Sequence, residues 1–139
     1  MNIATRIFAY RTTGPGMTDF TRDLRDFVSG EGAVEGVLHL MCRHTSASLT
    51  IQENADPDVQ VDLQSAMGRL APHDPSLYVH GIEGPDDMPA HIRTVLSGVT
   101  LSIPVLDGRL ALGTWQGVYL WEHRDRPHRR EVAATLMFV

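Results

Sequence analysis

The chain has 139 residues, of which 42% are hydrophobic and 21% charged, as is typical of a soluble globular protein. Its net charge of −5 argues against sequence-independent binding of nucleic acid, which needs clustered lysines and arginines. No apolar run is long enough to span a bilayer, and the N-terminal residues do not form a secretory signal. Cys42 is the only cysteine, so no internal disulfide is expected. These features predict one cytoplasmic domain, residues 1–139, without a membrane partner.

The first part of the chain predicts two strands separated by an amphipathic helix. Residues 3–12 favour a strand, which the glycines and proline at 14–16 end. Thr18 is the expected N-cap of a helix whose apolar residues recur at helical spacing: Phe20, Leu24, Phe27 and Val28. In residues 34–44 the side chains on both faces of the expected strand are fairly apolar. This pattern predicts a central strand that is covered on both faces.

A further strand at residues 47–53 is followed by a second helix. Asp56 is the expected N-cap of this helix, and Pro57 occupies its first position, where a missing N–H has no consequence. The buried stripe is expected to consist of Val59, Leu63, Ala66, Met67 and Leu70. Residues 77–80 are then expected to form a short strand, and residues 81–87 a loop rich in glycine and proline.

The last third predicts a short helix and a series of strands. The helix runs from Pro89 to Ser97, with inward-facing Ile92, Val95 and Leu96. The expected strands are residues 99–106, 109–112, 115–123 and 131–139. Asp107-Gly108 is a strong hairpin-turn signal between the first two of them. Consecutive strands after helices predict an α+β fold with a largely antiparallel sheet and about three helices.

Three histidines lie where an expected strand or helix meets a loop: His44, His80 and His91. Neutral imidazoles that leave a fourth position open would suit Zn²⁺ or a similar first-row ion. Their spacing matches no dedicated ligand motif, so three unrelated histidines with satisfied hydrogen bonds are the alternative.

Carboxylates gather in the same regions as these histidines. Glu53 and Asp87 have no evident role as helix caps, and converging carboxylates can hold Mg²⁺ with water. Glu122 ends a row of residues on one strand face and is expected to have a partner if it is buried. It is interpreted either as a general base or as the partner of Arg109 or Arg130.

Several neutral and basic side chains are candidates for binding a substrate. Thr45 and Ser46 offer hydroxyls to phosphate oxygens, and Thr114 and Gln116 lie on the same strand face. Arg130 belongs to a basic segment that could bind phosphate through two hydrogen bonds, although an exposed charged loop is the commoner case.

Three stretches of the chain resemble the YjbQ-like family. They are His44–Ile51 with Glu53-Asn54, Glu83–Ile92, and Gly108–Gly117 continuing to Glu122–Arg124. The resemblance implies a β/β/α layered fold, usually assembled as a homotrimer. It also implies that His44, His80 and His91 line a shared pocket with a bound metal or anion. Asn54 is then expected to contact substrate.

The family is named for a secondary thiamine-phosphate synthase activity. The resemblance therefore implies a transferase that condenses hydroxymethylpyrimidine diphosphate with thiazole phosphate, giving thiamine phosphate and pyrophosphate. In this hypothesis the three histidines bind a divalent metal (Zn²⁺ or Mg²⁺) or diphosphate, and Glu53, Asp87 and Glu122 orient metal, water or a small phosphorylated substrate. The alternatives are a metal-dependent hydrolase of a small phosphorylated or polar substrate, and a non-catalytic protein that binds a small anion.

Overall fold

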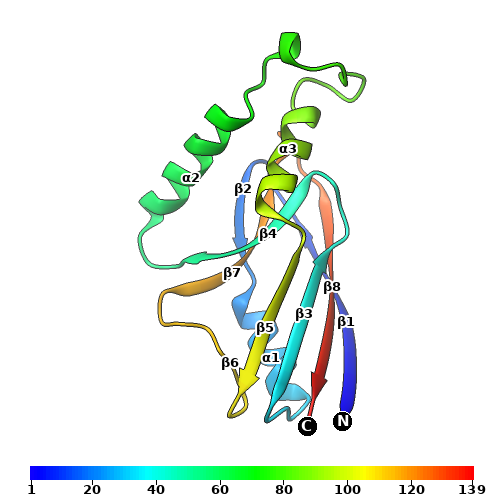
Figure 1. The fold of residues 1–139 in the computed structure, drawn as a ribbon, viewed down its shortest axis with the longest axis vertical. Helices are drawn as coiled ribbons and strands as arrows, with labels where there is room; N and C mark the ends of the chain where they lie inside the picture. Colours follow the sequence, from blue (N-terminus) through cyan, green and yellow to red (C-terminus); the bar gives the residue numbers. More distant parts are fainter.

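The computed structural model describes residues 1–139 and contains two antiparallel sheets and three α-helices (Figure 1). The five-stranded sheet has the order β1 (Asn2–Arg11), β8 (Arg129–Phe138), β3 (Gly36–Cys42), β5 (Thr100–Leu106), β6 (Arg109–Leu110). The three-stranded sheet has the order β2 (Gly16–Asp19), β7 (Gln116–Glu122), β4 (Ala47–Glu53). The helices are α1 (Thr21–Gly30), α2 (Pro57–Leu70) and α3 (Asp87–Ser97), with a 3₁₀ turn at Pro75–Leu77. The predicted α+β fold with antiparallel sheets is confirmed.

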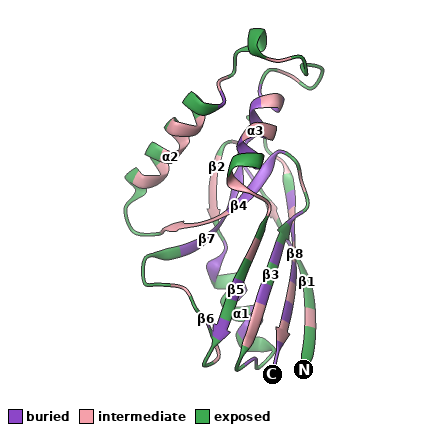
Figure 2. Ribbon diagram, in the orientation of Figure 1, coloured by how far each residue is buried: buried purple, intermediate pink, exposed green.

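The core lies against one face of the five-stranded sheet and is coloured purple in Figure 2. It is a cluster of 20 buried residues drawn from both sheets and from α1. Leu38 and Leu40 of β3 are almost fully buried in it, whereas His39 and Met41 on the other face of β3 are exposed. β3 is therefore central, as predicted, but the expectation that both of its faces are covered is wrong within this chain.

The start of α1 differs from the sequence-based prediction. Thr18 does not cap the helix, because it lies in β2 and pairs with Leu120 of β7. Asp19 instead supplies a hydrogen-bond acceptor to the first residue of the helix. Its Oδ1 atom accepts hydrogen bonds from the Thr21 N–H at 3.0 Å and from the Thr21 hydroxyl at 2.6 Å. The short strand β2 is not predicted from the sequence, because Gly14 and Pro15 precede it and Gly16 begins it, and such residues indicate a turn.

Helix α2 begins as predicted, with Asp56 accepting a hydrogen bond from the Asp58 N–H at 2.9 Å. Its expected apolar stripe is only partly buried: no residue of α2 is fully buried, and Leu70 at the end of the stripe is 67% exposed. The other four members of the stripe are half-buried: Val59, Leu63, Ala66 and Met67. Figure 2 shows the helix standing away from the sheets without buried residues. A hydrogen bond from Trp121 Nε1 to Gln64 Oε1 at 3.0 Å connects the helix to β7.

Two further expectations are corrected around α3. Residues 77–80 form no strand, because the chain turns there through the 3₁₀ segment. Val95 and Leu96 do not point inward but are 83% and 55% exposed. The face of α3 that packs against the protein instead carries Asp87, Pro89, Ala90, Arg93 and Thr94.

The predicted hairpin between β5 and β6 is confirmed. Asp107 and Gly108 have φ angles of 49° and 76°, the left-handed conformation that a tight primed turn requires at both central positions. None of the helices is both long and apolar enough to cross a membrane.

Candidate metal centre

His80, Asp87 and His91 form a cluster at the N-terminal end of α3. The Nε2 atom of His80 lies 2.7 Å from Oδ2 of Asp87, and Nε2 of His91 lies 3.0 Å from the same oxygen. All three potential ligand atoms lie within 4.8 Å of one another. Two imidazole nitrogens and one carboxylate oxygen thus converge on a single point.

A backbone contact fixes the tautomer of His91. Its Nδ1 atom lies 2.8 Å from the carbonyl oxygen of Thr45, which can only accept a hydrogen bond. Nδ1 therefore carries a proton, and Nε2 of the neutral ring presents a lone pair to the carboxylate of Asp87. Two acceptors that face each other need a cation between them, either a second proton on His91 or a metal ion.

Asp87 is oriented by Arg124. The Nη1 atom of Arg124 lies 2.9 Å from Oδ1 of Asp87, so Oδ2 is the oxygen that faces the histidines. Nε of Arg124 also contacts Oδ2 of Asp86 at 2.8 Å. Burial would raise the pKa of Asp87, but the hydrogen bond with His80 and the positive charges of His91 and Arg124 outweigh burial and lower the pKa. The carboxylate is therefore held in its ionised, ligand-competent form.

The local sequence explains how these residues meet. Asp87 is the first residue of α3, where the helix dipole favours a negative charge. His91 follows four positions later and lies on the same face of the helix. His80 comes from the preceding loop, which turns back at Gly84 with a φ of +104°, a conformation that favours glycine.

His44, expected to be the third histidine ligand, lies outside this cluster. Its Nε2 atom accepts a hydrogen bond from the Glu131 N–H at 2.7 Å, so the lone pair needed for a metal is engaged. Burial, and then the charge of Arg130, lower its pKa. Thr45 supplies its carbonyl oxygen to His91 rather than its hydroxyl to a phosphate.

Glu122 and Arg130 form a buried ion pair. Nε of Arg130 lies 2.8 Å from Oε1 of Glu122, its Nη2 atom contacts Oε2, and Thr12 donates a hydrogen bond to Oε1 at 2.6 Å. Nη2 of Arg130 also donates to the Ser46 hydroxyl at 3.0 Å. Burial would raise the pKa of Glu122, but the hydrogen bonds from Arg130 and Thr12 outweigh burial and lower it. Of the two interpretations of Glu122, the structure shows pairing with Arg130.

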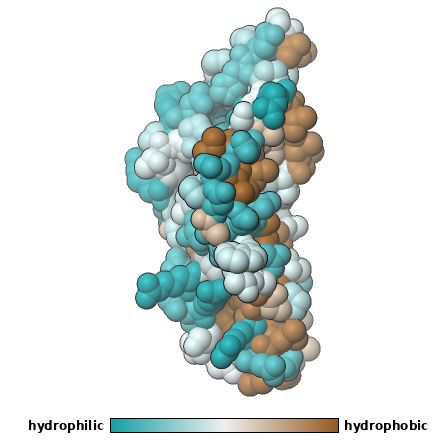
Figure 3. Space-filling view, turned by 90° about the vertical axis from the view of Figure 1, so that its left-hand side faces the viewer, coloured by the Kyte–Doolittle hydropathy of each residue, from teal (hydrophilic) through white to brown (hydrophobic).

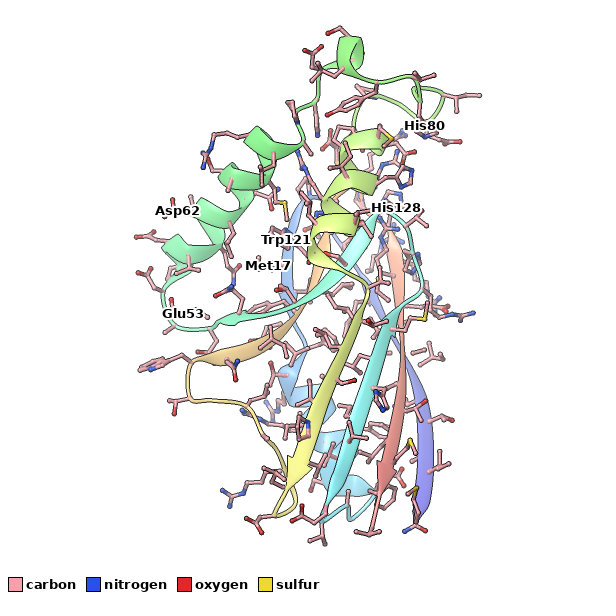
Figure 4. All side chains as sticks on the ribbon, in the orientation of Figure 1. Met17, Glu53, Asp62, His80, Trp121 and His128 are labelled. Carbon is pink, nitrogen blue, oxygen red and sulfur yellow. The ribbon has the colours of Figure 1, made fainter.

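The other expected site residues lie at the opposite end of β4 and β7. Glu53 pairs in register with Gln116, whereas Ala47 at the near end pairs with Glu122. At about 3.3 Å per strand residue, the two ends are roughly 20 Å apart, and Figure 4 shows Glu53 far from His80. Asn54 and Thr114 are exposed beside Glu53 and Gln116. The structure does not bring these four residues to the histidines, and their roles in binding or catalysis stay predictions.

Sequence reasoning missed Arg124, which contacts Asp87, and a separate buried pair, His123 and Ser48. Arg124 is not an exposed loop residue, since its side chain is only 12% exposed between Asp86 and Asp87. His123 and Ser48 are fully buried and hydrogen-bonded at 2.8 Å through Nε2 and Oγ. The neighbouring acids Asp86 and Asp87 indicate that a basic residue such as Arg124 is needed as their partner. No feature of the strand pattern indicates that His123 is buried and hydrogen-bonded.

Fold and site together define an antiparallel α+β protein with a two-histidine, one-carboxylate cluster at a helix N-terminus. The chain belongs to the YjbQ-like family: the family model described as "UPF0047 protein YjbQ-like" matches residues 6–138. The UPF0047 protein sll1880 of Synechocystis sp. is 51% identical over 126 residues, which cover 91% of this chain and 86% of that relative. The family assignment made from the sequence is confirmed.

Solved structures share the fold. A YjbQ/UPF0047-family protein from Clostridium acetobutylicum is 34% identical, with a TM-score of 0.87 over 95% of this chain and 99% of that one. A YbjQ-like protein of unknown function from Sulfolobus solfataricus has the same TM-score of 0.87 at 18% identity, covering 99% of this chain and 100% of the other. At that identity the second likeness shows the fold alone.

These comparisons correct the function expected from the sequence. The relatives carry a family number as their description, and one of the solved structures is described as a protein of unknown function. Family membership therefore gives no support for thiamine-phosphate synthase activity, and that expectation is wrong. The hydrolase and the anion-binding alternatives have no support either. The homotrimer, the phosphorylated substrate and the cytoplasmic location stay predictions.

Proposed function

We propose that the protein binds one divalent transition-metal ion through Nε2 of His80, Oδ2 of Asp87 and Nε2 of His91. The observation that carries the proposal is the convergence of both nitrogens on one carboxylate oxygen, at 2.7 and 3.0 Å. The Thr45 carbonyl supports it, because it leaves His91 with an unprotonated Nε2 in the neutral ring. A cation at this point satisfies all three ligand atoms.

The donor set favours Zn²⁺ over Mg²⁺. Imidazole nitrogens suit zinc and neighbouring first-row ions, whereas Mg²⁺ prefers oxygen ligands and retains several waters. A Zn²⁺ ion lies about 2.0 to 2.2 Å from nitrogen and oxygen ligands. Because the three ligand atoms of this cluster lie within 4.8 Å of one another, small side-chain adjustments bring all three to this distance from one ion. Three protein ligands leave a coordination position for water or another ligand.

Contacts around the ligands also fit a metal site. Metal-bound histidines commonly donate their second N–H to a carbonyl or carboxylate, which orients the ring. His91 makes this contact with Thr45, and Arg124 fixes the other oxygen of Asp87. The geometry is thus set by neighbours of the ligands and does not depend on the ion alone.

The test is a zinc titration of metal-depleted protein, with a competing chelator, for the wild type and single variants. His91→Ala and Asp87→Asn are expected to weaken zinc binding at least roughly tenfold, because each removes one of three ligands. His39→Ala is the matched control, since His39 is exposed on the outer face of β3 and bonds only Ser102. Unchanged zinc affinity in His91→Ala and Asp87→Asn would exclude this site.

A further inference from the structure

A largely apolar hollow adjoins the metal centre and shares His91 with it. The hollow has a volume of about 540 Å³ and is lined by residues of β3, the loop that follows β3, α3 and the turn between α3 and β5. Met41, Val95 and Val99 supply apolar walls, and Thr45 and His91 lie on the side of the metal centre. This volume lies in the usual range for pockets that hold small molecules.

The hollow contains no unpaired charge. Nη1 of Arg43 lies 2.8 Å from Oε2 of Glu131, so its charge is already matched. The hydroxyl of Thr94 donates to the Ala90 carbonyl at 2.9 Å, and Nε2 of His44 accepts the Glu131 N–H. Because these polar groups have partners, the hollow favours an apolar group over a phosphate or a carboxylate.

Two of the apolar walls are exposed to solvent. Val95 is 83% exposed and Met41 52% exposed, although both lie beside a side chain of the metal cluster. Figure 3 shows hydrophobic residues gathered toward its right-hand edge, the side that faces the viewer in Figure 1. Contiguous exposed apolar surface beside a polar site is a common mark of ligand binding.

We infer that the metal centre and this hollow together bind a small molecule with an oxygen-donor head, which coordinates the metal, and an apolar chain, which fills the hollow. The inference rests on the proposed metal-binding function. His91 links the two parts physically, since Nε2 faces the cluster while Nδ1 bonds Thr45, a residue of the hollow. The apolar chain stabilises the complex because it is removed from water, and each buried methylene group increases the affinity roughly a few-fold.

The experiment compares two hydroxamates of different chain length on the zinc-loaded full chain. Acetohydroxamate supplies the oxygen-donor head alone, and octanohydroxamate adds an alkyl chain. Octanohydroxamate is expected to bind at least roughly tenfold more tightly, measured by calorimetry. In Val95→Asn this advantage is expected to shrink severalfold while acetohydroxamate affinity and zinc affinity remain unchanged.

Leu96→Asn provides the matched control, because Leu96 is the next residue of α3, is 55% exposed, and does not line the hollow. It is expected to retain the full chain-length advantage. Equal affinities for the two hydroxamates on zinc-loaded protein would overturn the inference alone, as would a second copy of the chain that fills the hollow. Absence of zinc binding would overturn the proposed function and, with it, this inference.

Discussion

Arg124 and Asp87 form an ion pair in which Nη1 lies 2.9 Å from Oδ1, and both side chains are largely buried. This contact decides which carboxylate oxygen turns toward the histidines. Because Arg124 also bonds Asp86 and the Glu83 carbonyl, it joins the loop before α3 to the end of β7. Arg124 is thus a positioning residue for the proposed metal centre.

Replacement of Arg124 is expected to weaken metal binding without removing a ligand. Arg124→Gln should lower zinc affinity by about ten- to a hundredfold, the usual effect of losing a partner of a metal ligand. Competition with a chelator measures the change. Arg126→Gln is the control, since Arg126 is exposed two residues away and forms no ion pair in the structure. Equal zinc affinities in both variants would contradict the positioning role.

The Glu122–Arg130 pair is expected to contribute to stability rather than to metal binding. Glu122→Gln leaves the guanidinium of Arg130 buried without its anion, which should reduce the free energy of unfolding by about 3 kcal/mol. Urea denaturation monitored by circular dichroism measures this loss. Zinc affinity of the folded variant should match that of the wild type. A stable variant that has lost zinc binding would point instead to a direct role for Glu122 at the metal.

His123 should make the protein less stable in mild acid. Burial, and then the charge of Arg93, lower the pKa of His123 to about 4, whereas the unfolded value is 6.5. As the pH falls, His123 of the unfolded chain therefore binds its proton at a higher pH than His123 of the folded chain. The stabilisation is complete above the unfolded pKa and is lost as pH falls from about 6.5 to about 4.

The expected size of this effect is about 2 kcal/mol between pH 7 and pH 5. Urea denaturation at the two pH values measures the change for the wild type and for His123→Asn. The variant has lower stability at both values, but its stability should fall by about 2 kcal/mol less than that of the wild type. Parallel losses in the two proteins would show that His123 is not the group responsible.

Helix α2 should open more readily than the rest of the fold. No residue of α2 is buried, while four residues of α1 are buried in the core. Its C-terminal end is held by a hydrogen bond from Arg93 to the Ala71 carbonyl at 2.9 Å. Elements with few buried apolar contacts exchange their amide hydrogens through local opening.

Hydrogen–deuterium exchange followed by mass spectrometry tests this prediction. Amides of α2 should exchange well before those of α1 and β8. Arg93→Gln should accelerate exchange in α2 more than in β8, because it weakens the contact that holds Ala71. Slow exchange in α2, equal to that in α1, would show that another surface covers this helix in solution.

The sequence predicts most of the strands and helices because their patterns are local. Asp56-Pro57 at the start of α2 and the Asp107-Gly108 turn each rely on neighbouring residues, and both are confirmed. The sequence could not predict that α2 has no fully buried residue or that Val95 is exposed. Apolar spacing shows which face of a helix is hydrophobic but not whether another element covers it. The same limit applies to the outer face of β3.

The site was predictable in part. The sequence points to His80, Asp87 and His91 individually, but it predicts His44 as the third ligand beside the two histidines and gives Asp87 the role of orienting metal, water or substrate. The signal that would have joined them is the four-residue spacing of Asp87 and His91 on one helix face. Placing the helix start at Pro89 left Asp87 in the loop and hid this spacing. The engagement of His44 by a backbone N–H of β8 depends on tertiary structure and leaves no trace in the sequence.

X-ray absorption spectroscopy of the zinc-loaded protein tests the central claim most directly. The account predicts two imidazole nitrogens and one carboxylate oxygen at about 2.0 to 2.2 Å, with a further light-atom ligand such as water. It also predicts the loss of one imidazole contribution in His80→Ala and no change in His44→Ala. A shell of three imidazoles, or a spectrum altered by His44→Ala and unaltered by His80→Ala, would contradict it.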